Sequence, residues 1–233
     1  MALRTHYLGH DRAYQAKRAN PEFAGWSKRD DWADDWQQTW LPLVSRSAFP
    51  QTGKLLELGC GAGNVSIALA QVGYTVSGID IAPTAIAWAR EKAIAAQVEV
   101  EFVEGSVLTL EAFADESFDV AVDGRCLHCI IGGDREHFLA AAYRVLKPGG
   151  VLTLCSMCND VPDTPHFRET YDPQSRCTIQ QGIATRYIGN SNDILREVMA
   201  AGFRIVDVTL VPPRHEADLA DLQVLAAKVS VKQ

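Results

Sequence analysis

The strongest signal for the fold is the stretch Lys54-Leu-Leu-Glu-Leu-Gly-Cys-Gly-Ala-Gly-Asn64. Its three leucines favour a short buried strand, and an apolar helix over residues 65–72 follows at once. Between the two, Gly59, Gly61 and Gly63 alternate. Glycine permits positive φ and lets a ligand approach the backbone closely. A strand, a glycine turn and a helix N-terminus form a nucleotide-binding corner, because free N–H groups there face the ligand.

The spacing of the glycines narrows the choice of ligand. A dinucleotide fingerprint requires G-x-G-x-x-G, but Ser66 stands at the last glycine position counted from Gly61. The sequence instead reads E-x-G-x-G-x-G, with Glu57 two residues before the first glycine. The next strand ends at Asp80, where this kind of corner places the acid that binds a ribose. The alternative is an ordinary βαβ unit with an exposed aspartate.

The rest of the 233-residue chain alternates strands and helices. This alternation predicts an α/β fold with a seven-stranded, mostly parallel sheet and helices on both faces. The hydrophobic fraction of 47% suffices for a sizeable core. The expected strands are 54–59, 75–79, 98–103, 118–123, 150–156, 203–211 and 222–230, and the expected helices are 64–72, 83–96, 134–146 and 191–201.

Composition and charge exclude several classes of function. A net charge of −7 argues against a broad nucleic-acid-binding face. No apolar run approaches the ~20 residues of a membrane span. Residues 1–10 contain no apolar region of the kind found in a signal peptide, so the six cysteines are expected to be cytoplasmic thiols. We therefore expect no nucleic acid and no membrane as partners, and the oligomeric state, a homodimer included, stays open.

Two later motifs connect the glycine corner with a known family. Phe118-Asp-Val-Ala-Val-Asp123 forms the fourth strand, and Leu146-Lys-Pro-Gly-Gly150 precedes the fifth. With E-x-G-x-G-x-G, these motifs resemble the class I S-adenosylmethionine (SAM) dependent methyltransferases of the small-molecule type over residues 50–156. Asp123-x-Arg125 and Asp134-Arg135 are similar to the thiopurine and thiol methyltransferase branch, but its Gly-Pro-Pro-Phe text is absent. The resemblance implies a Rossmann-like fold, SAM as cofactor and a small-molecule methyl acceptor.

The resemblance also implies which residues contact the cofactor. Family members usually carry aspartate where Ser106 stands, to accept a hydrogen bond from the adenine amino group. A serine hydroxyl can accept one too, but without a charge. The implied cofactor contacts are Glu57, Gly59, Cys60, Gly61, Gly63, Asp80, Ile81, Gly105, Ser106, Val107 and Asp123.

Acceptor residues are expected beyond the fourth and fifth strands. His128 follows the fourth strand, so it or Asp123 is the candidate base, although His128 could equally be a packing histidine. Residues 157–190 contain three prolines and several arginines at the carboxyl end of the fifth strand, where ligands of open α/β sheets bind. The expected acceptor contacts are Trp36, Arg125, His128, His166, Arg168, Tyr171 and Arg186.

The first 50 residues carry four of the five tryptophans. Trp32, Trp36 and Trp40 are spaced by four, so a helix places them on one face. That stripe either packs an N-terminal helix on the core or covers the cofactor and acceptor. We expect residues 1–50 to form a helical lid, and residues 51–233 to form the methyltransferase domain with an acceptor-binding insertion at about 157–190.

Two C-x-x-C pairs, Cys126/Cys129 and Cys155/Cys158, leave a metal or redox role open. Cys155 lies inside an apolar strand, where a free cysteine is an ordinary core residue, so we expect no metal. The main hypothesis is a SAM-dependent methyltransferase, EC 2.1.1 type, acting on an oxygen or nitrogen of a small molecule. The alternatives are transfer to a thiol, selenium or a metalloid, and a non-catalytic SAM-binding or metal and redox protein.

Overall fold

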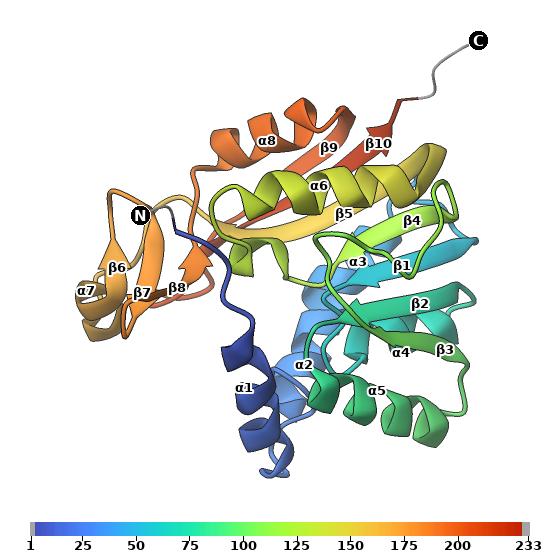
Figure 1. Cartoon of the computed structure of the whole chain (residues 1–233), viewed down its shortest axis with the longest axis horizontal. Coiled ribbons are helices and arrows are strands. Elements are labelled where there is room, and N and C mark those ends of the chain that lie inside the picture. Colours follow the sequence, from blue (N-terminus) through green and yellow to red (C-terminus); the bar gives the residue numbers. More distant parts are fainter. Residues whose placement is uncertain (1–2, 230–233) are drawn as a thin grey trace.

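The computed structural model describes residues 3–229, and its central element is a seven-stranded sheet (Figure 1). The strand order is β3-β2-β1-β4-β5-β10-β9, in which only β10 runs antiparallel to its neighbours. The order reverses between β1 and β4, which creates a crevice at the carboxyl ends of those strands. The predicted mostly parallel α/β sheet is confirmed. The strands are β1 (Lys54–Leu58), β2 (Thr75–Asp80), β3 (Val100–Glu104), β4 (Phe118–Asp123), β5 (Leu146–Cys158), β9 (Phe203–Val211) and β10 (Ala220–Lys228).

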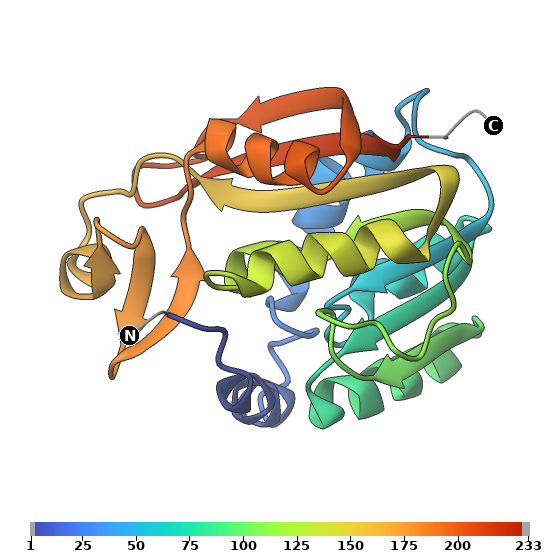
Figure 2. The ribbon, with the colours of Figure 1, turned by 45° about the horizontal axis from the view of Figure 1, so that its top comes forward.

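Helices cover both faces of this sheet, because successive side chains of a strand point to opposite faces. Leu56 packs in one cluster with Phe138 of α6 and Ile194 of α8, whereas Leu55 packs in another with Leu69 of α4. Figure 2 shows α6 and α8 together on one side of the sheet. Each fully buried leucine stabilises the fold by about 1.5–3 kcal/mol. The covering helices are α4 (Asn64–Gln71), α5 (Pro83–Ala96), α6 (Asp134–Val145) and α8 (Ser191–Ala200).

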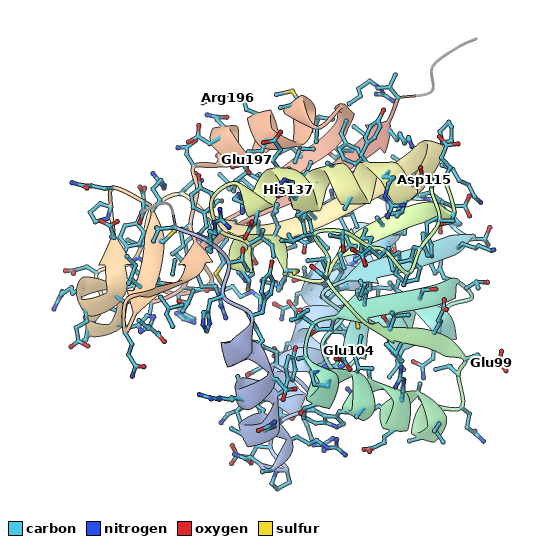
Figure 3. The ribbon with its side chains drawn as sticks, viewed as in Figure 1. Glu99, Glu104, Asp115, His137, Arg196 and Glu197 are labelled. Carbon is cyan, nitrogen blue, oxygen red and sulfur yellow. The ribbon has the colours of Figure 1, made fainter. Side chains whose placement is uncertain are left out.

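Helix ends and strand ends follow from local chemistry. The Asn190 side chain caps α8 by accepting from Asn192 N, and Arg135 on α6 pairs with Glu197 on α8 at 2.6 Å. Figure 3 places Glu197 beside α6 and His137 on the outer side of α6. β5 begins at Leu146, earlier than predicted, because a register shift opposite Phe118 and Val120 takes the turn residues into the strand. The last strand was expected to run to residue 230, which lies outside the described residues.

The insertion at 157–190 is more regular than its prolines suggest. It forms a three-stranded antiparallel sheet at one end of the molecule, beyond the carboxyl end of β5 (Figure 1). Pro165 occupies the first turn of a helix, where proline is tolerated. Gln181 and Gly182 have φ of 51° and 78° and join two strands in a tight turn. The elements are α7 (Pro165–Thr170), β6 (Tyr171–Asp172), β7 (Cys177–Gln180) and β8 (Ile183–Tyr187).

The described part of the N-terminal segment contains short helices, and most of the tryptophan stripe packs against the core. Trp40 is 1% exposed, and Trp32 and Trp36 pack against the same apolar cluster. No helix within residues 3–229 is long and apolar enough to cross a membrane. The segment contains α1 (Leu8–Arg18), α2 (Arg29–Asp35), a π-helical turn η1 (Trp36–Trp40) and α3 (Leu41–Val44).

Candidate cofactor and acceptor site

A cavity of about 210 Å³ lies at the carboxyl ends of β1, β2 and β4, between the glycine turn and the N-terminal segment. We call it the inner cavity. Its walls bring together residues that are far apart in the sequence, as the topology of a parallel sheet requires. Of the residues proposed from the sequence, it is lined by Glu57, Gly59, Cys60, Gly61, Asp80, Ile81, Val107, Arg125, His128 and Arg186.

The glycine turn forms one wall and depends on positive φ. Gly59, Gly61 and Gly63 have φ of 69°, 52° and 74°. A Cβ on Gly61 would lie 2.2 Å from Tyr14 Oη, so only bare backbone fits beneath that tyrosine. Gly63 does not line the cavity, contrary to expectation, because it faces Phe102, 2.6 Å from where its Cβ would lie, and serves the packing of the sheet.

Asp80 lies at the base of the inner cavity and is 8% exposed. Its Oδ2 accepts from Gly61 N at 2.8 Å and its Oδ1 from Ala82 N at 2.9 Å. Burial raises the pKa of the carboxyl, and the backbone donors oppose that shift. Each carboxylate oxygen can accept more than one hydrogen bond. Asp80 is therefore fixed in position and can still accept from the hydroxyls of a bound ribose.

Glu57 is a second acid on this wall and is 2% exposed. Burial raises its pKa to about 8, although Ser66 donates to Oε2 from its backbone N at 2.7 Å and from its hydroxyl. The carboxyl is thus mostly protonated at neutral pH. Lys92 lies close by and donates to Ala24 O at 2.6 Å and Ala62 O at 3.1 Å, which ties the N-terminal segment to the glycine turn.

The residues expected around the adenine are only partly in place. Val107 and the 36%-exposed Ile81 line the inner cavity. Ser106 does not, because its Oγ accepts from Leu108 N at 3.2 Å within a local turn. Gly105 faces Ile79 rather than the cavity. The apolar wall of the cavity is therefore built by Ile81 and Val107, and the Ser106 hydroxyl holds the loop.

His128 stands on the opposite wall, in the short helix η2 (Leu127–Cys129) that follows β4. It is 4% exposed, and its Nδ1 has no hydrogen-bond partner within residues 3–229. Burial, and then the charges of Arg186 and Arg125, lower the pKa of the imidazole well below its usual range. His128 is thus a neutral ring with a free polar atom beside the cavity.

Asp123 does not line the inner cavity, and its expected role as a base or cofactor contact stays a prediction. It is fully buried, and its Oδ1 accepts from Cys126 N at 2.7 Å and Leu127 N at 3.1 Å. Burial raises the pKa of its carboxyl to about 7. Asp123 therefore fixes the turn that carries His128.

Arg125 reaches the inner cavity in a strained backbone conformation, with φ of 65°. Its Nη1 donates to Asp221 at 2.8 Å and its Nη2 to Asp35 at 3.0 Å. The Nε is buried and has no partner among the described residues. Two carboxylates, those of Asp35 and Asp221, therefore neutralise the charge of this guanidinium.

The other expected acceptor residues lie apart. Arg168 pairs with Asp163 at 2.5 Å on the surface, and Tyr171 begins β6. Trp36 packs with Trp32 and lines no cavity described for residues 3–229. His166 lies in a second, adjoining cavity, and only Arg186 among the arginines of the insertion faces the inner one.

Several residues that line the inner cavity were not predicted from the sequence. Tyr14 covers Gly61, and Trp26 lies outside the spacing of the tryptophan stripe. Thr5, Tyr7 and His10 come from the segment at and before α1. Their positions depend on how α1 crosses the edge of the sheet, which is held by Asp11 Oδ1 accepting from Thr84 N at 2.8 Å. Only the tryptophan content of the N-terminus pointed to this region.

The cysteines give no support to a metal centre. Within the part of the chain that the structure describes, no group of three or more His, Cys, Asp or Glu is placed to hold a metal ion. Cys60 and Cys126 line the inner cavity, and burial raises the pKa of both thiols well above the usual range. Both are therefore neutral thiols at physiological pH, without the thiolate character of a reactive cysteine.

Comparison with known proteins supports the same interpretation of the fold. A family model described as a methyltransferase domain matches residues 56–154. An uncharacterized protein of Haemophilus influenzae is 28% identical over 190 residues, covering 78% of this chain and 70% of that protein. A ubiquinone biosynthesis O-methyltransferase of Pseudomonas entomophila is 38% identical over 100 residues, but these are only 42% of this chain and 41% of that protein.

A solved structure extends the likeness beyond the matched domain. A protein of Methanosarcina mazei described as a SAM-dependent methyltransferase superposes with a TM-score of 0.65 at 23% identity. The superposition covers 79% of this chain and 96% of that one. At this identity the likeness concerns the fold, and the residues of the inner cavity have to be judged on their own chemistry.

The inner cavity fits a nucleoside joined to an amino-acid chain. Asp80 can receive the hydroxyls of a ribose, and Ile81 and Val107 offer an apolar surface to a base. The glycine turn leaves backbone free beside Asp80, where a side chain would block the approach. These features occur together at the switch point of the sheet, the usual ligand position in this architecture.

Proposed function

We propose that this chain, which belongs to the class I SAM-dependent methyltransferases, transfers a methyl group to an oxygen or nitrogen of a small-molecule acceptor. SAM is its cofactor and supplies, when bound, a methyl group activated by the positive charge on sulfur. The task left to the protein is to align the acceptor, to exclude water and to accept a hydrogen bond from the reacting group.

The cofactor side of this proposal rests on the glycine turn and Asp80. The backbone of Gly59 and Gly61 would hold the methionine part, and Asp80 would accept from the ribose hydroxyls. Ile81 and Val107 would contact the adenine ring. Tyr14 would cover the cofactor from the N-terminal side, since it already lies against Gly61.

On the acceptor side, His128 is the residue that we propose to orient the reacting group. Its Nδ1 has no partner in the described part of the chain, and leaving a buried polar atom unpaired is costly. Because the ring stays neutral, it can accept a hydrogen bond from an acceptor O–H or N–H. This unpartnered, buried imidazole nitrogen, in a residue that lines the inner cavity, is the observation that carries the proposal.

Turnover of SAM to S-adenosylhomocysteine tests the function. We expect the purified chain to bind S-adenosylhomocysteine and to produce it in the presence of at least one acceptor among phenols, carboxylates and amines. If S-adenosylhomocysteine is produced only with thiols or selenols, the enzyme methylates sulfur or selenium and not oxygen or nitrogen. Binding without turnover on any acceptor would leave a SAM-binding protein instead of an enzyme.

The N-terminal segment up to residue 50 is proposed as a lid over residues 51–233. Support comes from Tyr14 and Trp26, which lie over the inner cavity, and from the Arg18–Glu91 ion pair at 2.7 Å. Limited proteolysis should cut within residues 1–40 of the free protein and be suppressed by S-adenosylhomocysteine. Equal cleavage with and without the ligand would contradict a moving lid.

A cytoplasmic location and the absence of nucleic acid as a partner remain part of the proposal.

A further inference from the structure

A second cavity, of about 880 Å³, adjoins the inner one between α1 and the three-stranded sheet of the insertion. We call it the outer groove. The two cavities share five wall residues, so they lie side by side. An acceptor that reaches His128 can therefore extend into the outer groove. The shared residues are His10, Trp26, Cys129, Met157 and Arg186.

The outer groove differs in charge from the rest of the molecule. The chain has 29 acidic and 22 basic residues, yet no aspartate or glutamate is found among the described residues that line the groove. Arg12 on α1 and Arg186 on β8 face it from opposite sides, and three histidines add polar edges. The inner cavity, in contrast, is lined by Asp35, Glu57 and Asp80.

Arg186 is the distinctive group of the outer groove. It is half-buried, its Nη1 donates to Thr185 O at 2.9 Å, and its guanidinium lies 5.4 Å from the Trp26 ring. No carboxylate within residues 3–229 forms an ion pair with Arg186 or Arg12. Partly burying a guanidinium without a counter-ion costs free energy, so an external anion would stabilise it.

The walls around Arg186 also contain apolar surface. Trp26 is 41% exposed and Met157 is half-buried, and both line the two cavities. Phe167 extends this surface along the groove. A ring placed on Trp26 could therefore hold an attached anion next to the guanidinium, because arginine binds planar anions in bidentate fashion.

We propose that the outer groove binds the anionic end of the methyl acceptor, and that the acceptor is an organic anion with an aromatic or apolar body. This inference rests on the proposed function, since it assigns the substrate class of that same site. The anion, a carboxylate, sulfonate or phosphate, pairs with Arg186 and, where it is long enough, with Arg12. The body lies against Trp26 and Met157, and the methylated atom lies near His128.

The test compares an anionic probe with a neutral probe of the same shape. We choose 8-anilinonaphthalene-1-sulfonate and its uncharged counterpart N-phenyl-1-naphthylamine, titrated by fluorescence into the protein saturated with S-adenosylhomocysteine. Saturation occupies the place of the cofactor in the inner cavity, so the acceptor side and the outer groove are left to the probes. The variants are Arg186→Gln and, as a matched control from the same insertion, Arg168→Gln, whose guanidinium is paired with Asp163 on the surface.

We expect Arg186→Gln to weaken binding of the sulfonate probe about tenfold or more, the size of a lost charge-assisted hydrogen bond. Arg168→Gln should change nothing, and the neutral probe should bind all three proteins alike. The proposal is overturned by any of three results: no sulfonate binding to the wild type, equal binding to Arg186→Gln, or parallel loss of the neutral probe.

Two further readouts separate this inference from neighbouring explanations. Calorimetry on the wild type should show binding of S-adenosylhomocysteine, so failure there concerns the proposed function and not the groove. The second readout compares the concentrations at which benzoate and a single-stranded oligonucleotide displace the sulfonate probe. If the oligonucleotide acts at the lower concentration, the groove binds nucleic acid rather than a small organic anion, and the proposal is contradicted.

Discussion

The glycine corner, residues 54–82, and the acceptor side, made by the N-terminal segment, the short helix η2 and residues 157–190, meet at one cavity but are built differently. The corner is a single piece of chain in which backbone groups form the site, as Gly61 N does in donating to Asp80. The acceptor side joins three distant segments through side chains such as Trp26, His128 and Arg186. The corner is therefore sensitive to small changes in backbone space, whereas the acceptor side should tolerate substitution and lose only particular contacts.

The largest effect is expected at Gly59. A Cβ there would lie 2.6 Å from Cys126 Cβ, and the φ of 69° adds strain, so Gly59→Ala should weaken S-adenosylhomocysteine binding by about tenfold to a hundredfold. Gly73→Ala is the matched control, because its φ is also positive, at 104°, but nothing lies within 4 Å of the added Cβ. Calorimetry should show normal affinity in the control. Equal losses in both variants would assign the effect to strain rather than to the space around the glycine turn.

On the acceptor side, His128→Ala should lower kcat by about twofold to tenfold while the affinity for SAM stays the same. The lost hydrogen bond acts on the acceptor during transfer, and such bonds contribute about 0.5–1.5 kcal/mol between neutral groups. Steady-state kinetics with the best acceptor of the panel gives kcat, and calorimetry gives the SAM affinity. His137→Ala, on the exposed side of α6, is the control (Figure 3). An unchanged kcat in His128→Ala would make His128 a packing residue.

Each of the two regions contains a buried acid that should make the stability of the protein depend on pH. Glu57 in the corner and Asp123 under η2 have pKa values raised from 4.5 and 3.8 to about 8 and about 7. The folded chain thus keeps protons that the unfolded chain releases near pH 4. Because the folded chain binds these protons more tightly, the free energy of unfolding is highest below pH 4. It falls as pH rises to about 8. The Tm should fall between pH 5 and pH 8, and less so in Glu57→Gln. A Tm that rises over this range in the wild type would contradict the assignment.

The smallest effect is expected at Ser106, where the corner meets the adenine loop. Ser106→Ala removes only the bond from Leu108 N, so stability should fall by about 0.5–1.5 kcal/mol and SAM affinity should change by less than about tenfold. Denaturant melts and calorimetry check the two values. A larger loss of affinity, restored by Ser106→Asp, would place the hydroxyl on the adenine after all.

The difference between the regions also explains what the sequence could predict. A turn that needs positive φ at fixed positions leaves glycines at fixed spacing, so the corner and its sheet were recognisable from residues 54–80. The hairpin of the insertion also left a signal, Gln181-Gly182 between two alternating segments, which the prolines obscured. Nothing local distinguishes Arg168 from Arg186, because only tertiary packing pairs the first with Asp163 and directs the second into the cavities.

Asp123 shows a different limit of sequence reasoning. The end of β4 was recognised correctly, but an acid at a strand end can face the ligand or its own following turn. Here Oδ1 accepts from the backbone N–H groups of Cys126 and Leu127, whereas Oδ2 has no partner among the described residues. The turn contains Arg125 with a φ of 65°, which no propensity predicts for arginine.

Calorimetric titration of SAM into the wild type, Asp80→Asn and Asp115→Asn tests the central claim most directly, namely that the corner built on Asp80 holds the cofactor. Asp115 is an exposed acid paired with Arg144 at the other end of the sheet and serves as the control (Figure 3). We predict binding by the wild type, the same affinity in Asp115→Asn, and a loss of about tenfold or more in Asp80→Asn, from weakened hydrogen bonds to the ribose hydroxyls. Undiminished affinity in Asp80→Asn, or no binding by the wild type, would contradict the account.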